Sequence, residues 1–327
     1  MAGAFDSADG FDLAVARLSI ALGMAAGKHL SDAASVFALE VPDLTALDDA
    51  HRTIWLSAAL EHVRRKLSPI PDEAARCFGR WGPEVFREAK RDLKARYALI
   101  ISPTSTNTVD SRLLELVIRS QTNFVRNSLG VRMKTLGEKA RQVVSSGLES
   151  GLGRKEVARN LAGMAHAELV GRATSYWDVV AGAFIGSGRS ASQMSAYAEA
   201  GIHRYVIEAV LDEHTTEICR FLHGKTFRVE DALSRLERAA ALEDPMEIKS
   251  LQPWVRDGTS DKDGHRWLYA GQGSERKPVV EVLRGGFGSR DVRGEYGRCL
   301  SDRQLADLGV SLPPFHGLCR TTTVPGD

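Results

Sequence analysis

Two short pairs of cysteine and histidine residues are the part of this sequence best suited to chemistry. Cys219 and His223 are four residues apart in "CRFLH", and His316 and Cys319 are three apart in "HGLC". Thiolate and imidazole groups are ligands that zinc prefers, and two close pairs separated by a long stretch of chain are typical of tetrahedral zinc sites. The spacing therefore indicates a candidate zinc site made of these four residues.

The same residues have two other interpretations. Cys219 could be a buried apolar thiol and His223 a turn residue, with no metal involved. A disulfide between Cys219 and Cys319 is a third arrangement. Catalysis by a cysteine–histidine pair is less well supported, because no neighbouring residue is marked as the base, and the chain has no Walker loop, nucleophile elbow or H-E-x-x-H motif. We therefore expect no enzyme activity and no small-molecule substrate.

Composition limits the class of protein. The chain has 327 residues, of which 43% are apolar and 26% charged, as in an ordinary soluble protein. Its formal net charge of +1 identifies no partner, and four cysteines are too few for a secreted disulfide framework. No apolar run approaches the roughly 20 residues of a membrane span, and the N-terminus is acidic where a signal peptide would be basic. We expect a cytoplasmic protein that does not contact a membrane.

The elements that must position these residues are mostly helices. Apolar residues at helical spacing begin near the N-terminus with Phe11, Val15, Leu18 and Leu22. A second helix is predicted over residues 44–67, before two prolines, and a third over 82–100 with a proline in its first turn. Residues 102–110 form a polar linker in which Asp110 is the predicted N-cap.

The predicted fold is mainly α in its N-terminal two thirds, with a small α+β C-terminal domain. Strands are expected near residues 205–210 and 225–229, followed by a helix over 230–243 and a last short helix that ends at Gly309. The predicted regions are an N-terminal helical region (1–101), the linker (102–110), a basic helical region (111–200) and the C-terminal domain (201–327), with an irregular insertion at about 244–298.

The basic helical region is a candidate for DNA contact. Between Ser111 and Arg172 the sequence has eleven lysine and arginine residues but only five glutamates. Such an excess of positive charge could follow a nucleic-acid backbone, with Arg119, Arg126 and Arg132 as the contact residues. A solvated helix face is the alternative, because no aromatic residues alternate with these charges.

Two segments also resemble a known family. "VLDEHTTEICRFLHGKTF" and the later "PPFHGLCRT" resemble the signature of the phage Mu F / SPP1 head-morphogenesis family of minor head proteins. The positions that match the family in the first segment are Asp212, Thr215, Cys219, Leu222, Gly224, Lys225 and Phe227. Those in the second are Pro313, Pro314, His316, Cys319 and Arg320. With upstream helical segments the match covers about residues 145–325, less an insertion at about 230–310.

The match also has departures. The family has cysteines where this chain has Thr216 and Thr321, and its Arg-Thr-Glu sequence is replaced after residue 172. If all the family's cysteines bound one metal, His223 and His316 would have to replace the missing ones. The matching residues imply that the two segments meet in space. We call residues 212–227 and 313–321 the clasp.

The resemblance implies a minor head protein rather than an enzyme. Such a protein would contact the portal or capsid protein, and DNA, during head assembly and DNA packaging or delivery. It would lie in the host cytoplasm during assembly and then in the virion or capsid interior. Two alternatives remain: a domesticated prophage protein, or a toxin or effector that carries the same C-terminal module.

Overall fold

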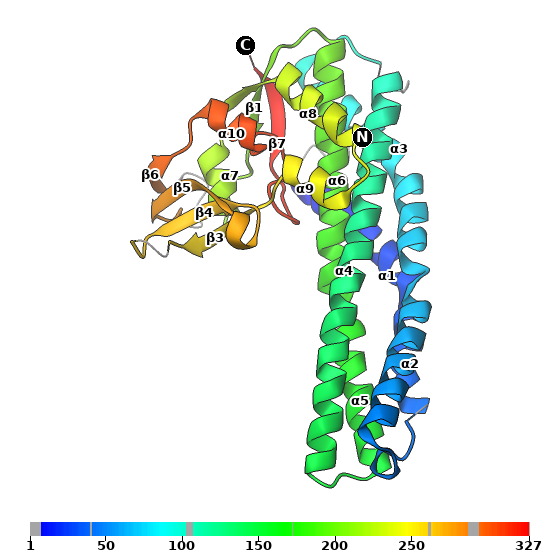
Figure 1. Cartoon of the computed structure of the whole chain (residues 1–327). Coiled ribbons are helices and arrows are strands. Elements are labelled where there is room, and N and C mark those ends of the chain that lie inside the picture. Colours follow the sequence, from blue (N-terminus) through cyan, green and yellow to red (C-terminus); the bar gives the residue numbers. More distant parts are fainter. Residues whose placement is uncertain are drawn as a thin grey trace. The chain divides into compact units, whose positions relative to one another are not determined.

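The computed structural model describes residues 8–39, 41–102, 107–171, 173–260, 263–286 and 294–326. The predicted fold class is confirmed, because long helices precede two small antiparallel sheets in the C-terminal part (Figure 1). The helices before the first strand are α1 (Ala8–Leu39), α2 (Asp49–Leu67), α3 (Ile70–Tyr97), α4 (Thr108–Glu149), α5 (Arg154–Leu169) and α6 (Ala173–Glu199), with a 3-10 turn, η1 (Leu44–Ala46), after α1.

The C-terminal part alternates strands with short helices. Its strands are β1 (Arg204–Glu208), β2 (Thr226–Arg228), β3 (Val255–Thr259), β4 (Arg266–Ala270), β5 (Lys277–Arg284), β6 (Glu295–Cys299) and β7 (Thr322–Gly326). Its helices are α7 (Glu217–Leu222), α8 (Val229–Ala241), α9 (Pro245–Leu251) and α10 (Asp302–Leu308), with a 3-10 turn, η2 (Gly273–Glu275).

The chain divides into two compact units. The sheet-containing unit comprises the start of α1 up to Ala16, residues 79–120 and residues 181–326, and the helical unit comprises residues 17–78 and 121–180. Helices α1, α3, α4 and α6 contribute residues to both units. The predicted regions 1–101, 102–110, 111–200 and 201–327 stay a prediction.

The helical unit has an apolar core, and a few hydrogen bonds of polar side chains connect its segments. Leu18 and Leu22 of α1 are buried, as their spacing predicts. The Ser19 hydroxyl donates to Asp178 of α6 at 2.6 Å, and Arg154 Nε donates to the carbonyl of Val41 at 2.7 Å. Buried apolar side chains supply most of the stabilisation of such a bundle.

The sheet-containing unit holds two sheets. Strands β2, β1 and β7 form one antiparallel sheet in that order, and β3, β4, β5 and β6 form the other (Figure 1). The central strand β1 pairs Tyr205 with Phe227 of β2 and with Pro325 of β7. Because β7 is the last strand of the chain, the segment that precedes it returns to the start of the C-terminal part.

Helix α6 packs against β7. The Tyr197 hydroxyl donates to the carbonyl of Thr323 at 3.0 Å, and the Gln193 amide donates to the Thr322 hydroxyl at 2.9 Å. Tyr197 is fully buried, and burial raises its pKa. These contacts fix the last strand against a long helix and so help to position the residues just before it.

Two local predictions are wrong. Helix α3 starts at Ile70, so Pro83 lies inside it rather than at its first turn. The helix continues through the proline, although proline usually interrupts a helix. The helix packs tightly here, because a Cβ on Gly82 would lie 2.4 Å from Leu114 Cδ1. Asp110 is not the N-cap of α4: the Asn107 side chain accepts from the Asp110 N–H at 2.8 Å, while the buried Asp110 carboxylate accepts from Lys90 Nζ at 2.6 Å.

The predicted irregular insertion is mostly a sheet. Helix α9 and strands β3 to β6 occupy most of the range 244–298. The strands are short and interrupted by glycines, and the register shifts twice along the β5–β6 pair. Bulged, glycine-rich strands weaken the alternating pattern by which a strand is predicted from sequence.

Helix α1 contains a stretch, Asp9–Ala38, that is long and apolar enough to cross a membrane by length and composition alone. The sequence pattern had indicated no such stretch. Leu18, Leu22 and Leu30 of α1 are buried, but only 28% of the apolar window is buried, and Ile20 and Met24 are exposed.

Candidate metal centre

Cys219 lies in the first turn of helix α7, which follows a hydrogen-bonded turn at residues 212–215. The Asp212 N–H donates to the Thr215 hydroxyl at 2.8 Å, and the His214 N–H donates to Asp212 Oδ1 at 2.9 Å. Thr216 then occupies the N-cap position with extended backbone, and α7 begins at Glu217. One turn of helix separates Thr216 from Cys219, so both side chains lie on the same face.

The second half of the site is the turn that contains the partly exposed His316 and the buried Cys319. The Gln252 amide donates to the carbonyls of Leu312 and Pro313 at 3.0 and 3.3 Å. The Val255 N–H donates to the carbonyl of Phe315 at 3.0 Å. The turn is therefore held by the end of α9 and by β3, and the peptide bond between Pro313 and Pro314 is cis.

Helix α6 approaches this turn very closely. A Cβ added to Gly182 would lie 2.6 Å from the carbonyl oxygen of Gly317, and one added to Gly186 would lie 3.3 Å from Pro314 Cβ. A side chain at Gly182 would therefore displace the backbone of the turn. The glycines of α6 allow the turn to lie directly on the helix.

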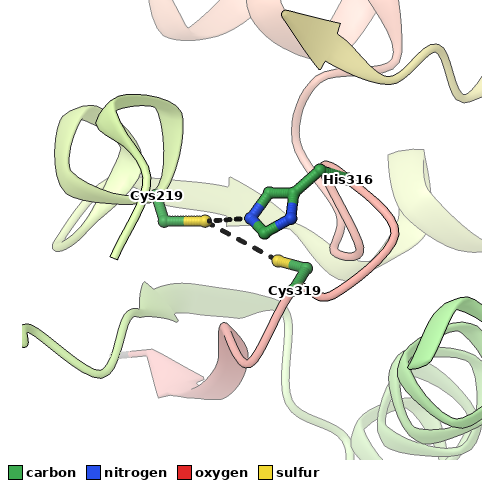
Figure 2. A group of neighbouring side chains, drawn as sticks. All are labelled: Cys219, His316 and Cys319. Atoms are coloured by element: carbon green, nitrogen blue, oxygen red, sulfur yellow. Dashed lines mark hydrogen bonds between the residues drawn. The ribbon is translucent and has the colours of Figure 1, made fainter. Parts of the chain in front are cut away.

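Three potential metal ligands meet at this point. Cys219 Sγ lies 3.6 Å from Cys319 Sγ and 3.4 Å from His316 Nε2 (Figure 2). All three ligand atoms lie within 4.8 Å of one another. In a tetrahedral site with Zn–S distances of ~2.3 Å and Zn–N distances of ~2.0 Å, the S···S and S···N edges are about 3.8 and about 3.5 Å. The two distances from Cys219 Sγ are close to these edges, so the group could hold a metal ion.

The two thiols share a hydrogen bond, so they titrate as a pair. The bond to Cys319, together with burial, raises the pKa of Cys219 well above its ordinary value. Burial also raises the pKa of Cys319, but hydrogen bonds from Cys219 and His316 outweigh it and lower that pKa well below its ordinary value. Cys319 is thus the first to become a thiolate, the form that binds metals. Both cysteines are free, so the structure contains no disulfide between them.

His223 is not part of this group, contrary to the prediction. Helix α7 ends at Leu222, and His223 has a non-helical backbone with φ −56° and ψ 125°. Its N–H donates to the carbonyl of Cys219 at 3.0 Å, the bond that closes the last turn of the helix. The His223 ring accepts a hydrogen bond at Nδ1 from the Ala209 N–H at 3.1 Å, which holds the chain after α7 against the end of β1.

Thr216, rather than His223, contacts this group. Its hydroxyl lies 3.0 Å from His316 Nε2 and 3.3 Å from Cys219 Sγ. The signal was available in the sequence, because Thr216 and Cys219 have the T-x-x-C spacing of two side chains on one helix face.

A charged pair lies beside the three potential metal ligands. Arg320 Nη2 donates to both carboxylate oxygens of Asp212. The carbonyls of Arg320 and Thr321 accept from Arg189 Nη2 of α6 at 3.0 and 2.7 Å. Burial lowers the pKa of Arg189 to about 10, so Arg189 remains charged at neutral pH. Two charged contacts thus hold the end of the turn: Asp212 bonds the Arg320 side chain, and Arg189 bonds the carbonyls of Arg320 and Thr321.

Two further predicted clasp residues, Gly224 and Lys225, make contacts outside the Cys219, His316 and Cys319 group. Gly224 has a φ of 82°, which favours glycine, and its N–H donates to the carbonyl of Ile207 at 2.8 Å. Lys225 Nζ donates to Asp302 of α10 at 2.7 Å. Arg320 follows Cys319 in the chain and contacts Asp212, which is bonded to Thr215, and Pro313 and Pro314 form the cis peptide bond that precedes His316.

The three arginines predicted to contact DNA each contact the protein. Arg119 Nη2 donates to the carbonyl of Ala240 at 2.7 Å, and Arg126 Nη1 donates to Asn123 at 2.8 Å. The Arg132 guanidinium lies 4.2 Å from the centre of the Tyr176 ring. Arg126 is the most exposed of the three, and the other two are partly buried.

No protein-family model, characterised protein or solved structure matches the chain. The site is therefore described by its own residues: two buried thiols and an imidazole, from two segments that lie about a hundred positions apart in the sequence.

Proposed function

We propose that this chain is a minor head protein of a phage or prophage. In this proposal it associates with the portal or capsid protein during head assembly, and with DNA during packaging or delivery, by binding rather than by catalysis. Its place is the host cytoplasm during assembly and then the capsid interior.

One observation carries the proposal. The two sequence segments that resemble the head-morphogenesis family form one site, through Cys219, His316 and Cys319 and through the Asp212–Arg320 pair. Two unrelated chance matches would have no reason to meet with their matching side chains in contact. The contact therefore supports the interpretation that the segments are two halves of one module, interrupted by the insertion that contains β3 to β6.

We infer further that the metal is zinc and that its role is to hold the clasp closed. Two thiolates and one imidazole form a ligand set that suits zinc, and the cysteines are buried. When bound, zinc would join α7 to the turn before β7 and so stabilise the C-terminal part. The protein would present this part, with the long helices, to its partners.

Particles purified after induction of the prophage that encodes the chain test the head-protein proposal. Mass spectrometry of purified procapsids and virions should find the chain together with the portal and major capsid proteins. A gene deletion complemented by the Asp212→Asn variant, which weakens the clasp, should yield fewer particles than complementation by an Arg17→Gln control. If complete particles contain none of this chain, and the deletion does not change particle yield, the proposal is wrong.

A further inference from the structure

The candidate metal centre offers fewer ligands than a closed zinc site. Among the described residues, Cys219, His316 and Cys319 are the cysteine, histidine or acidic residues that form the group. A structural zinc ion takes four protein ligands, whereas a zinc ion with three keeps its fourth position for water or another exchangeable group. With three protein ligands, this group would leave the fourth position of a zinc ion free, which we call an open site.

The fourth position lies beside Thr216. The Thr216 hydroxyl is close to two of the three ligand atoms, at 3.0 Å from His316 Nε2 and 3.3 Å from Cys219 Sγ. A neutral hydroxyl is not among the common zinc ligands, which are thiolate, imidazole and carboxylate. It can, however, donate or accept a hydrogen bond and so orient a group that does bind the metal.

This side of the site faces solvent. Cys319 is fully buried and Cys219 is 3% exposed, His316 is partly exposed and Thr216 is exposed. The two sulfur atoms therefore form the floor of the site, and a small molecule or a side chain of another protein can reach the metal past Thr216. Arg320, whose charge would attract anions, is held by Asp212.

We propose that the clasp binds zinc as an open, three-ligand site, in which the fourth ligand is exchangeable and Thr216 positions it. The group that exchanges is a water molecule or a borderline or soft donor, such as an imidazole or a thiolate, because these donors suit zinc. The inference rests on metal binding at the clasp but not on the role in head assembly. It makes the clasp a place where a histidine or cysteine of a partner protein can complete the coordination.

Cobalt substitution tests this proposal on the full chain. Co²⁺ replaces zinc in such sites and reports the ligand set by its visible absorption. Imidazole, added to the Co²⁺-loaded protein, should change the absorption saturably while the metal remains bound, as checked by elemental analysis after rapid desalting.

Thr216→Cys should close the site. We expect stronger thiolate-to-cobalt absorption, at least a tenfold gain in affinity for Zn²⁺ in competition with a chromophoric chelator, and no response to imidazole. Thr53→Cys adds a cysteine on the exposed face of α2, outside the metal-ligand group, and should behave like the unmodified chain.

Two results would overturn the inference. One is Co²⁺-loaded protein whose spectrum imidazole leaves unchanged, which would mean that the coordination is already complete. The other is a chain that takes up neither Co²⁺ nor Zn²⁺, which would also remove the zinc part of the proposed function. Neither result would decide whether the chain belongs to phage heads, which the particle experiment tests separately.

Discussion

Arg320 donates hydrogen bonds at 2.5 Å to both carboxylate oxygens of Asp212, 108 residues earlier in the chain. Both side chains are mostly shielded, with exposed fractions of 15% and 23%. Burial alone would raise the pKa of Asp212, but hydrogen bonds from Arg320, Thr215 and the His214 backbone outweigh it and lower the pKa. The pair connects the two segments of the clasp independently of any metal.

Removing the charge of Asp212 should therefore weaken the fold. Asp212→Asn keeps the shape of the side chain and loses the charge-assisted bond, which typically contributes about 1.5–3 kcal/mol. We predict a loss of about 2 kcal/mol in the free energy of unfolding, measured by urea denaturation. Glu230→Gln removes an exposed pair with Arg228 and should cost less than about 1 kcal/mol. Equal effects of the two variants would contradict the role of the Asp212–Arg320 pair.

The contact of α6 with the turn at Gly317 gives a second prediction. Gly182→Ala places a methyl group 2.6 Å from the Gly317 carbonyl, so the turn must move. We predict destabilisation of about 1–3 kcal/mol and faster proteolysis of the segment after residue 310.

Gly163→Ala is the matched control for this helix-glycine substitution. A Cβ at Gly163, in the interior of α5, meets no atom within 4 Å. Alanine is the better helix former, so this variant should gain up to about 1 kcal/mol. If Gly182→Ala is as stable as the unmodified chain, the turn does not lie on α6 as described.

The sheet of β3 to β6 should be sensitive to acid. Glu281 of β5 is bonded by Arg298 and His265, and these bonds lower its pKa to about 2. A hydrogen bond from Ser260 and others from His265 and Arg298 lower the pKa of Asp263 to about 2 as well. Carboxyl groups in an unfolded chain titrate near pH 4.

The sign of the effect follows from these shifts. Because the folded pKa values are lowered, the stabilisation is fully present above about pH 4.5 and is lost as pH falls toward about 2. Denaturation at pH 6, 4 and 3 should show this loss, and Glu281→Gln should reduce its slope. Glu275→Gln, at an exposed position of η2, should keep the slope of the unmodified chain. An unchanged slope in Glu281→Gln would refute this account.

DNA binding by the basic helical region is the fourth prediction. The full chain should bind duplex DNA at low salt, with an affinity that falls steeply as salt rises. Arg126→Gln should reduce the slope of log K against log salt by about 0.9, the value for one phosphate contact. Arg119→Gln and Arg132→Gln should change it less, because the Ala240 carbonyl and the Tyr176 ring already engage these guanidinium groups.

Arg17→Gln removes an exposed charge of α1 and is the control for this series. It should leave the slope unchanged. Absence of binding at low salt, or equal slopes for Arg126→Gln and the unmodified chain, would exclude the basic region as a DNA contact.

The sequence predicted what depends on local pattern. Phe11, Val15, Leu18 and Leu22 are all buried on one face of α1, and β1 and β2 lie where their β-branched and aromatic residues indicated. Gly309 ends α10 with a φ of 85°, as expected of a helix-terminating glycine. Such features need few long-range contacts to form.

The errors concern positions where long-range packing decides. The insertion forms a sheet because its short strands pair with one another, which no single segment reveals. Asp110 is buried beside Lys90 of another helix. At the start of α4 the Asn107 side chain accepts from the Asp110 N–H, and the Asp110 carboxylate accepts from the Asn107 N–H in return. In the site, Cys219, His316 and Cys319 meet as expected. The His223 ring accepts a hydrogen bond from the Ala209 N–H instead of joining them, and the Thr216 hydroxyl lies against His316.

The zinc content of the purified full chain tests the central claim most directly. Elemental analysis should find about one zinc per chain, lost in Cys219→Ser and in Cys319→Ser together with protease resistance of the C-terminal part. Cys299→Ser removes an exposed cysteine outside the group and should retain the metal. A fully folded, metal-free chain, or equal zinc content in all three variants, would contradict the account.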